Sequence, residues 1–168
     1  MTATLAPMRI LVVCLGNICR SPLAEAALRH ELAAAGAHDV VVDSAGTGDW
    51  NVGKPPDSRM RAAADQVGLR LAGSARQIAA ADLRDSDLIL VMDRQNLADV
   101  QALAPDPDTR SRVHLFLGYA GIGGEVPDPY FGGEEGFTDV VTMVRAAAAA
   151  IARRVAARAG RGSEVDRT

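Results

Sequence analysis

Residues 10–22 read ILVVCLGNICRSP, and this stretch decides the fold. Its first four residues are apolar and largely β-branched, which is typical of a buried strand. A short loop follows, and Ser21-Pro22 predicts a helix start, because serine is a favoured cap and proline suits the first helical position. A strand, a short loop and a helix N-terminus in succession predict a phosphate-binding loop after the first strand.

The residues of this loop suggest a nucleophile beside a bound oxyanion. Cys14 stands at the end of the expected strand, facing the partial positive charge of the loop amides and the helix N-terminus. In that field, with Arg20 nearby, the thiol should ionise more readily than a free cysteine. Arg20 can place two N–H donors on phosphoryl oxygens, and the Ser21 hydroxyl can donate to the thiolate.

Length and composition fit a soluble globular enzyme. The chain has 168 residues, 48% of them apolar, and a formal net charge of -3, which indicates neither a disordered chain nor a basic nucleic-acid binder. We expect a single domain over 1–168, with residues 1–7 and 160–168 frayed. No membrane span or secretory signal is evident, so we expect a cytoplasmic monomer or weak dimer, although export without a cleaved signal stays open.

Neither a metal nor an organic cofactor is expected. Both cysteines, Cys14 and Cys19, lie in the same short loop, and the three histidines lack ligand spacing around them. Cys19 leaves two interpretations open. It could form a reversible disulfide that protects Cys14 from over-oxidation, or it could pack as a small apolar side chain.

Four apolar strands alternate with helices along the chain. This alternation predicts an α/β fold: one three-layer domain in which a four-stranded parallel sheet is flanked by helices. Strands are expected at residues 10–14, 40–42, 88–92 and 113–117, and helices at 23–35, 57–67, 79–83, 94–103 and 138–159, with a long loop over 118–136.

Polar residues gather where these strands end. Cys14, Ser44, Asp93 and Asp128 follow the four strands in turn, so they should meet at one rim of the sheet, where α/β proteins bind ligands. Phosphoryl transfer from an aryl ester also needs a proton for the leaving oxygen. Asp128 between two prolines is the best candidate for that acid, although an Asp-Pro turn without chemistry is the ordinary use of this dipeptide.

The motif Cys-x5-Arg-Ser is the signature of cysteine-dependent protein tyrosine phosphatases. The fuller string over residues 13–22 resembles the low-molecular-weight branch of that group. Residues 128–132, DPYFG, are similar to the DPYYG acid loop of this branch, with Phe131 in place of its second tyrosine. Residues 49–53, DWNVG, resemble the loop whose aromatic residue borders the substrate entrance.

The resemblance implies roles for individual residues. It implies that Asp128 is the general acid and that Trp50 and Tyr130 are apolar walls for a substrate ring, with Leu15 at the lip; a core anchor is the alternative for Trp50. Phosphate and substrate contacts are expected from Leu15, Gly16, Asn17, Ile18, Cys19 and Ser21, and support of the loop from Ser44.

Two further features bear on loop support. The family usually has a histidine shortly before Ala-Arg-Gln, but here Gly73 or Ser74 occupies that region, so Asn17 should have reduced support. Residues 92–96 also match a family motif, in which Asp93 is as readily a helix cap as a residue that orients Arg20.

The function predicted is hydrolysis of phosphotyrosine in proteins, by Cys14 attack and Asp128 protonation. Three alternatives stay open. A protein arginine phosphatase would carry threonine in place of Ile18, and an arsenate reductase of this fold would need further cysteines on another segment. A non-enzymatic phosphate-binding or phosphocarrier module would need no acid at position 128.

Overall fold

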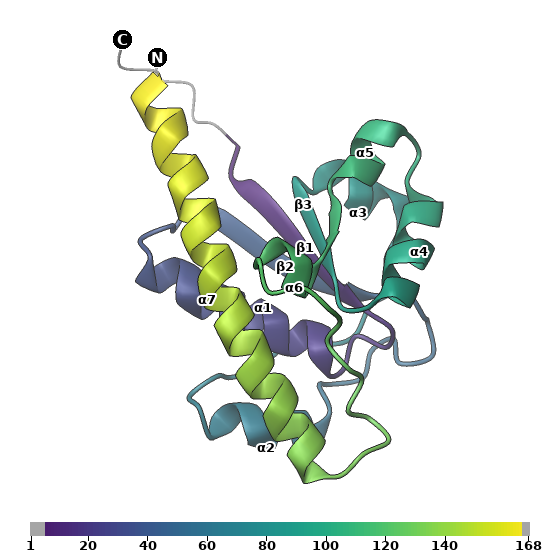
Figure 1. The fold of residues 1–168 in the computed structure, drawn as a ribbon. Helices are drawn as coiled ribbons and strands as arrows, with labels where there is room; N and C mark the ends of the chain where they lie inside the picture. Colours follow the sequence, from purple (N-terminus) through teal and green to yellow (C-terminus); the bar gives the residue numbers. More distant parts are fainter. Residues whose placement is uncertain (1–5, 166–168) are drawn as a thin grey trace.

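Strands and helices alternate along the chain in the computed structural model, which describes residues 6–165 (Figure 1). The elements are β1 (Met8–Cys14), α1 (Arg20–Ala34), β2 (Val40–Gly46), α2 (Ser58–Asp65), α3 (Ala80–Asp85), β3 (Leu88–Val91), α4 (Arg94–Leu103), α5 (Pro107–Ser111), β4 (Val113–Leu115), α6 (Phe116–Tyr119) and α7 (Glu134–Val165).

The strands form one parallel sheet in the order β2-β1-β3-β4, which confirms the predicted fold class. The chain therefore leaves β1 toward β2 on one side and later returns to β3 on the other. Ligands bind at this kind of reversal in strand order, beyond the carboxyl ends of the strands. Cys14 lies at that point, paired in register with Gly46 of β2.

Alternating side chains of β1 face two different helical layers. Ile10 and Val12 pack into the core shared with α1 and α7, whereas Leu11 and Val13 pack into the core shared with α3 and α4. Figure 1 shows these helices on opposite faces of the sheet. Because both faces are covered, β1 is buried along its length from Ile10 and holds the loop that follows it on a rigid base.

Helix α1 begins earlier than the sequence predicted. Arg20 is its first residue and Cys19 stands at the cap position without a side-chain cap, so the prediction of Ser21 as the cap is wrong. Pro22 fits two residues further in, because N–H groups throughout the first helical turn lack an intrahelical partner. The Ser21 hydroxyl is thereby free to face the loop.

Other boundaries also differ from the prediction. Helix α7 runs from Glu134 to Val165 instead of 138–159. The strand expected over 113–117 ends at Leu115, and the short helix α6 follows it. Helix α5, where a turn was expected, begins after an Asp106 cap with proline in its first turn. Of the ends expected to fray, 1–7 and 160–168, residues 1–5 and 166–168 lie outside the described residues, and 160–165 belong to α7. Among the described helices, none has the length and apolar character to cross a membrane.

Candidate active site

A pocket of about 240 Å³ opens beyond the carboxyl ends of β1 and β2. It brings together segments that are far apart in the sequence: the loop after β1, the loop after β2 and the segment before α7. Its walls are formed by Cys14, Leu15, Gly16, Ile18, Cys19, Arg20, Trp50, Asn51, Lys54, Asp128, Tyr130 and Phe131. Three of the predicted residues, Asn17, Ser21 and Ser44, lie buried behind this lining.

Peptide groups of the first loop are oriented by bonds on its outer side. The carbonyl oxygens of Leu15, Gly16 and Ile18 accept hydrogen bonds from segment 48–57 at 2.8–3.4 Å. In a trans peptide the N–H group points opposite to the carbonyl. The N–H groups that follow these three carbonyls therefore turn toward the inner side of the loop, where they can receive an anion.

The thiol of Cys14 is buried within hydrogen-bonding distance of two donors. Its Sγ lies 3.0 Å from Ser21 Oγ, and the Asn17 amide N–H donates to Sγ at 3.3 Å. Ser21 Oγ also accepts a hydrogen bond from Asn17 Nδ2 at 2.8 Å, so its own hydrogen can be donated to the sulfur at 3.0 Å or to the more distant Ala45 carbonyl at 3.5 Å. These donors can stabilise a thiolate more than a thiol.

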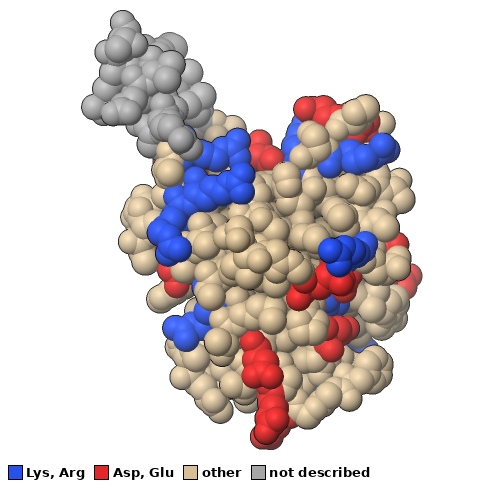
Figure 2. All heavy atoms as spheres, in the orientation of Figure 1, with Lys and Arg blue, Asp and Glu red and all other residues tan. Residues whose placement is uncertain are grey.

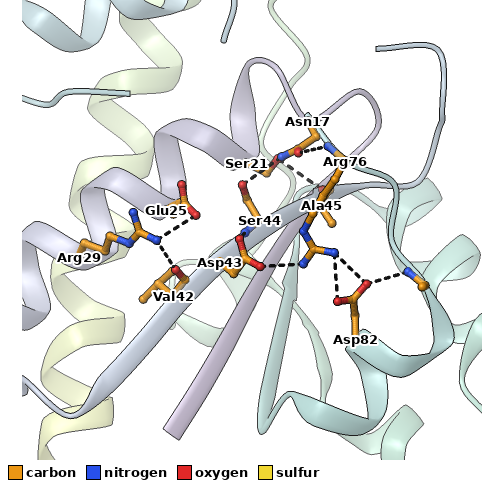
Figure 3. A network of polar contacts seen from close by, with 11 residues as sticks. Asn17, Ser21, Glu25, Arg29, Val42, Asp43, Ser44, Ala45, Arg76 and Asp82 are labelled. Atoms are coloured by element: carbon orange, nitrogen blue, oxygen red, sulfur yellow. Dashed lines mark hydrogen bonds and ion pairs between the residues drawn. The ribbon is translucent and has the colours of Figure 1, made fainter. Parts of the chain in front are cut away.

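Asn17 is held in an unusual backbone shape. It has a φ of +55°, in the left-handed region that asparagine tolerates better than most residues. Its Nδ2 donates to Ser44 Oγ at 3.1 Å, and its Oδ1 accepts from the Arg76 main-chain N–H at 3.0 Å (Figure 3). A backbone amide from a distant segment thus engages the asparagine oxygen.

Arg20 is fixed by two groups and lies near a third. Its Nη1 lies 2.7 Å from Asp93 Oδ2 and donates to the carbonyl of Val126 at 3.0 Å, and its Nη2 is 3.6 Å from Asp128 Oδ2. Asp93 also caps α4, because its Oδ1 accepts from the Asn96 N–H at 2.8 Å. The sequence presented these two roles of Asp93 as alternatives, whereas the structure combines them.

The segment that carries Asp128 lies at the surface. The Asp128 side chain is 37% exposed, and its Oδ1 accepts from the Tyr130 N–H at 3.1 Å. The guanidinium of Arg59 lies 5.1 Å from the centre of the Tyr130 ring and 4.6 Å from that of Phe137. Sequence reasoning missed Arg59, because no local pattern connects α2 with this distant segment.

Aromatic side chains form an exposed rim around the pocket. Trp50 is 60% exposed and Phe131 is 93% exposed, so neither is an anchor in the core. The indole packs on Gly48, where an added Cβ would collide with the ring. Phe131 meets Tyr130 edge-on, with 5.0 Å between ring centres. Such faces can pack against an aromatic ligand.

Cys19, like Cys14, is free and buried. Burial, and next the charge of Asp57, raises the pKa of the Cys19 thiol to about 12. A neutral thiol neither attacks nor exchanges readily. Its environment is therefore that of a small packed side chain. Among residues 6–165, no group of three or more acidic, histidine or cysteine side chains is placed to hold a metal.

Fold and pocket together define an α/β protein that can hold a tetrahedral oxyanion between a thiol, an arginine and a ring of amides. The family described as low molecular weight phosphotyrosine protein phosphatase matches residues 9–161. The chain belongs to this family. Two residues of the pocket lining, Asn51 and Lys54, were not proposed as site residues from the sequence. Asn51 lies within the family-like stretch 49–53, and Lys54 directly follows it.

Named relatives cover most of the chain. A low molecular weight phosphotyrosine protein phosphatase of Schizosaccharomyces pombe is 42% identical over 136 residues, 79% of this chain and 86% of that protein. A low molecular weight protein-tyrosine-phosphatase of Streptomyces coelicolor is 41% identical over 160 residues, 90% and 98% of the two chains.

Solved structures show the same architecture. A protein tyrosine phosphatase from Entamoeba histolytica, with Hepes in its active site, superimposes with a TM-score of 0.84 at 32% identity, covering 88% of this chain and 96% of that one. YfkJ from Bacillus subtilis gives a TM-score of 0.81 at 32% identity, with 92% and 97% covered.

Proposed function

We propose that this protein hydrolyses phosphotyrosine in phosphoproteins, and other aryl phosphates, through a cysteinyl-phosphate intermediate. The observation that carries the proposal is the convergence of three groups on one pocket. Cys14 and Arg20 lie at the two ends of the loop after β1, Asp128 belongs to the distant segment before α7, and all three line it. They supply a nucleophile, a fixed positive charge and a proton donor, which are the three requirements of the reaction.

The first half-reaction transfers the phosphoryl group to sulfur. The Cys14 thiolate attacks phosphorus, and the bond between phosphorus and the phenolic oxygen breaks. Asp128 gives its proton to that oxygen, so the product leaves as a neutral phenol. Arg20 and the loop amides hold the equatorial phosphoryl oxygens, on which charge is spread in the transition state.

The second half-reaction returns the enzyme to its starting state. Asp128, now ionised, takes a proton from a water molecule that attacks the phosphorus of the intermediate. The bond between sulfur and phosphorus breaks, inorganic phosphate leaves, and the electron pair returns to Cys14. The Ser21 hydroxyl, 3.0 Å from Sγ, stabilises the sulfur as a leaving group.

An aromatic substrate suits the walls of the pocket. Trp50 and Tyr130 offer ring faces, and Ile18 adds an apolar side chain where a guanidinium would need a polar partner. A solved relative, Wzb from Vibrio vulnificus, is a complex with benzylphosphonate, a phosphorus acid that carries a phenyl ring; it is 32% identical, with a TM-score of 0.78. These features favour phosphotyrosine over phosphoarginine and phosphoserine.

The test compares four compounds with three proteins. Phosphotyrosine, phosphoserine and phosphoarginine peptides and arsenate are offered to wild type, Cys14→Ser and Asp128→Ala. We expect wild type to hydrolyse phosphotyrosine fastest, Cys14→Ser to be inactive and Asp128→Ala to be slow while still binding phosphate. Phosphatase activity that survives in Cys14→Ser would contradict the mechanism. If wild type prefers one of the other three compounds, phosphotyrosine is not the substrate.

The proposal includes a cytoplasmic monomer or weak dimer that needs neither metal nor organic cofactor. Fractionation of cells tests the cytoplasmic location, and sedimentation of the purified protein tests the oligomeric state. Turnover that persists after dialysis against a chelator tests whether a metal is needed.

A further inference from the structure

Behind the loop that holds Cys14 lies a cluster of three charged side chains, here called the Arg76 cluster: Asp43, Arg76 and Asp82. Arg76 Nη2 lies 2.8 Å from Asp43 Oδ2, and its Nη1 lies 3.0 Å from both carboxylate oxygens of Asp82. Figure 3 shows the guanidinium between the two carboxylates. The cluster thus ties the segment before α3 to β2 and to α3 itself.

Main-chain groups of Arg76 connect this cluster to the candidate active site. The carbonyl of Arg76 accepts from the Gly46 N–H at 2.9 Å, beside the end of β1, and its N–H donates to Asn17 Oδ1 at 3.0 Å. One residue therefore lies between the sheet edge and the loop, with its side chain anchored on one side and its peptide engaged on the other.

Asn17 depends on this contact. Within residues 6–165, the Arg76 N–H is the hydrogen-bond donor to Asn17 Oδ1, and Asn17 is buried. A buried amide oxygen without its donor is costly, so displacement of the Arg76 peptide would force the asparagine to move. Because the Asn17 N–H donates to Cys14 Sγ, such a movement reaches the peptides that would surround phosphate.

We propose that Arg76 is a positioning residue for the candidate phosphate site. Its two ion pairs hold the peptide whose N–H fixes Asn17, and through Asn17 they keep the loop in its oxyanion-binding shape. This inference rests on the proposed function, since it presupposes that the loop binds phosphate. All three side chains of the cluster are partly exposed, so the ion pairs themselves add little to global stability.

Calorimetric titration with inorganic phosphate measures the effect directly, without turnover. In Arg76→Ala we expect about tenfold weaker phosphate binding, because a buried Asn17 oxygen that loses its donor has a cost of this order. In Arg76→Lys the retained charge should restore part of the affinity. Kinetics with p-nitrophenyl phosphate should show a rise in KM of similar size and a smaller change in kcat.

Arg112→Ala is the matched control. Arg112 pairs with Asp108 and donates to the Ser86 carbonyl, outside the pocket lining, so its loss should change thermal stability without changing phosphate affinity. If Arg76→Ala and Arg112→Ala lower Tm similarly and both bind phosphate as wild type does, the positioning role is wrong. If Arg76→Ala fails to fold, Asp82→Asn replaces it in this comparison, because it removes one of the two carboxylate partners of Arg76.

A double-mutant cycle tests the route through Asn17. Asn17→Gly removes the side-chain amide but tolerates the left-handed backbone. In that background Arg76→Ala should cause no further loss of affinity, whereas an equal further loss would show that Arg76 acts independently of Asn17. If wild type binds no phosphate, the proposed function is wrong. If wild type binds phosphate and Arg76→Ala binds it equally well, only the positioning role of Arg76 is wrong.

Discussion

The phosphate loop, residues 14–21, and the rim formed by Trp50, Asp128, Tyr130 and Phe131 are built in opposite ways. In the loop Asn17, Arg20 and Ser21 are buried; Asn17 and Ser21 are hydrogen-bonded to each other, and Asn17 and Arg20 also have partners in other segments. The rim side chains are exposed, and few contacts hold them. The end of the site that would receive a constant phosphoryl group is thus fixed, whereas the end that would meet a variable substrate is open.

The physical reason lies in what each half must do. An oxyanion is stabilised by donors that already point at it and need no reorganisation during the reaction. A proton donor on a surface segment can approach the leaving group and later admit water. Substitutions in the phosphate loop should therefore reduce activity toward every substrate, and those in the rim should act selectively.

Arg20→Lys should have the largest effect. Lysine keeps the charge but lacks the planar fork, so it cannot hold two phosphoryl oxygens while also bonding to Asp93 and Val126. We expect kcat/KM for p-nitrophenyl phosphate to fall about 10³-fold, as when a transition-state donor is lost. A loss of less than tenfold would place the arginine outside the chemistry.

Asp128→Asn should have the next largest effect, and one that depends on the leaving group. Asparagine preserves the size of the side chain but has no proton to transfer, so turnover of phenyl phosphate should fall about 10²–10³-fold. p-Nitrophenol leaves more readily as an anion, and its ester should lose less. Equal losses with both esters would argue against proton donation.

Trp50→Ala should act on aromatic substrates alone. Removal of an aromatic contact worth about 0.5–1.5 kcal/mol should raise KM for a phosphotyrosine peptide roughly 2–12-fold. The inhibition constant of inorganic phosphate should not change. Phe131→Ala is the comparison within the same lining, and its effect should be smaller, because its ring is the more exposed of the two and less of its apolar area can be buried. A large change in phosphate inhibition would mean that the indole supports the loop.

Cys19→Ala should change stability at high pH and not the reaction itself. Burial raises the pKa of the Cys19 thiol from its ordinary value of 9.0 to about 12. The unfolded chain therefore loses this proton first, so the stabilising contribution is complete below pH 9 and declines as the pH rises toward 12.

Urea unfolding at pH 7.5, 9 and 10 measures this difference. Wild type should lose stability more steeply than Cys19→Ala between the two higher values. The variant itself should be somewhat less stable at pH 7.5, because a small cavity replaces the sulfur. If the stability of wild type and that of Cys19→Ala fall in parallel with pH, the Cys19 thiol has the same pKa in the folded and the unfolded chain.

Much of this arrangement could be predicted from the sequence. Apolar runs separated by helical patterns predicted the parallel sheet, and polar residues at or after the strand ends predicted the positions of Cys14, Asp93 and Asp128. Short-range patterns suffice here, because a strand and the loop after it are adjacent in the chain. Ser44 was expected after a strand that ends at residue 42, but it lies inside β2, which continues to Gly46. Helix ends were less accurate, since Arg20 and Ser21 already lie inside α1.

What the sequence did not predict depends on contacts between distant residues. Arg76 meets Asn17 across 59 positions, and Asp93 meets Arg20 across 73, a contact that the sequence offered only as one of two alternatives. Arg59 lies over Tyr130 only because α2 and the segment before α7 are adjacent in space. No local periodicity specifies such pairs, which follow from how the layers pack.

The partners of Arg20 have a consequence for synthesis of the chain. The loop and its arginine leave the ribosome early, but Asp93 and the Val126 carbonyl follow only after most of the polypeptide has been made. A nascent chain that stops short of these residues would carry Cys14 beside a guanidinium without its anchors. The capacity to bind phosphate should therefore emerge late in translation, close to the completion of the sheet.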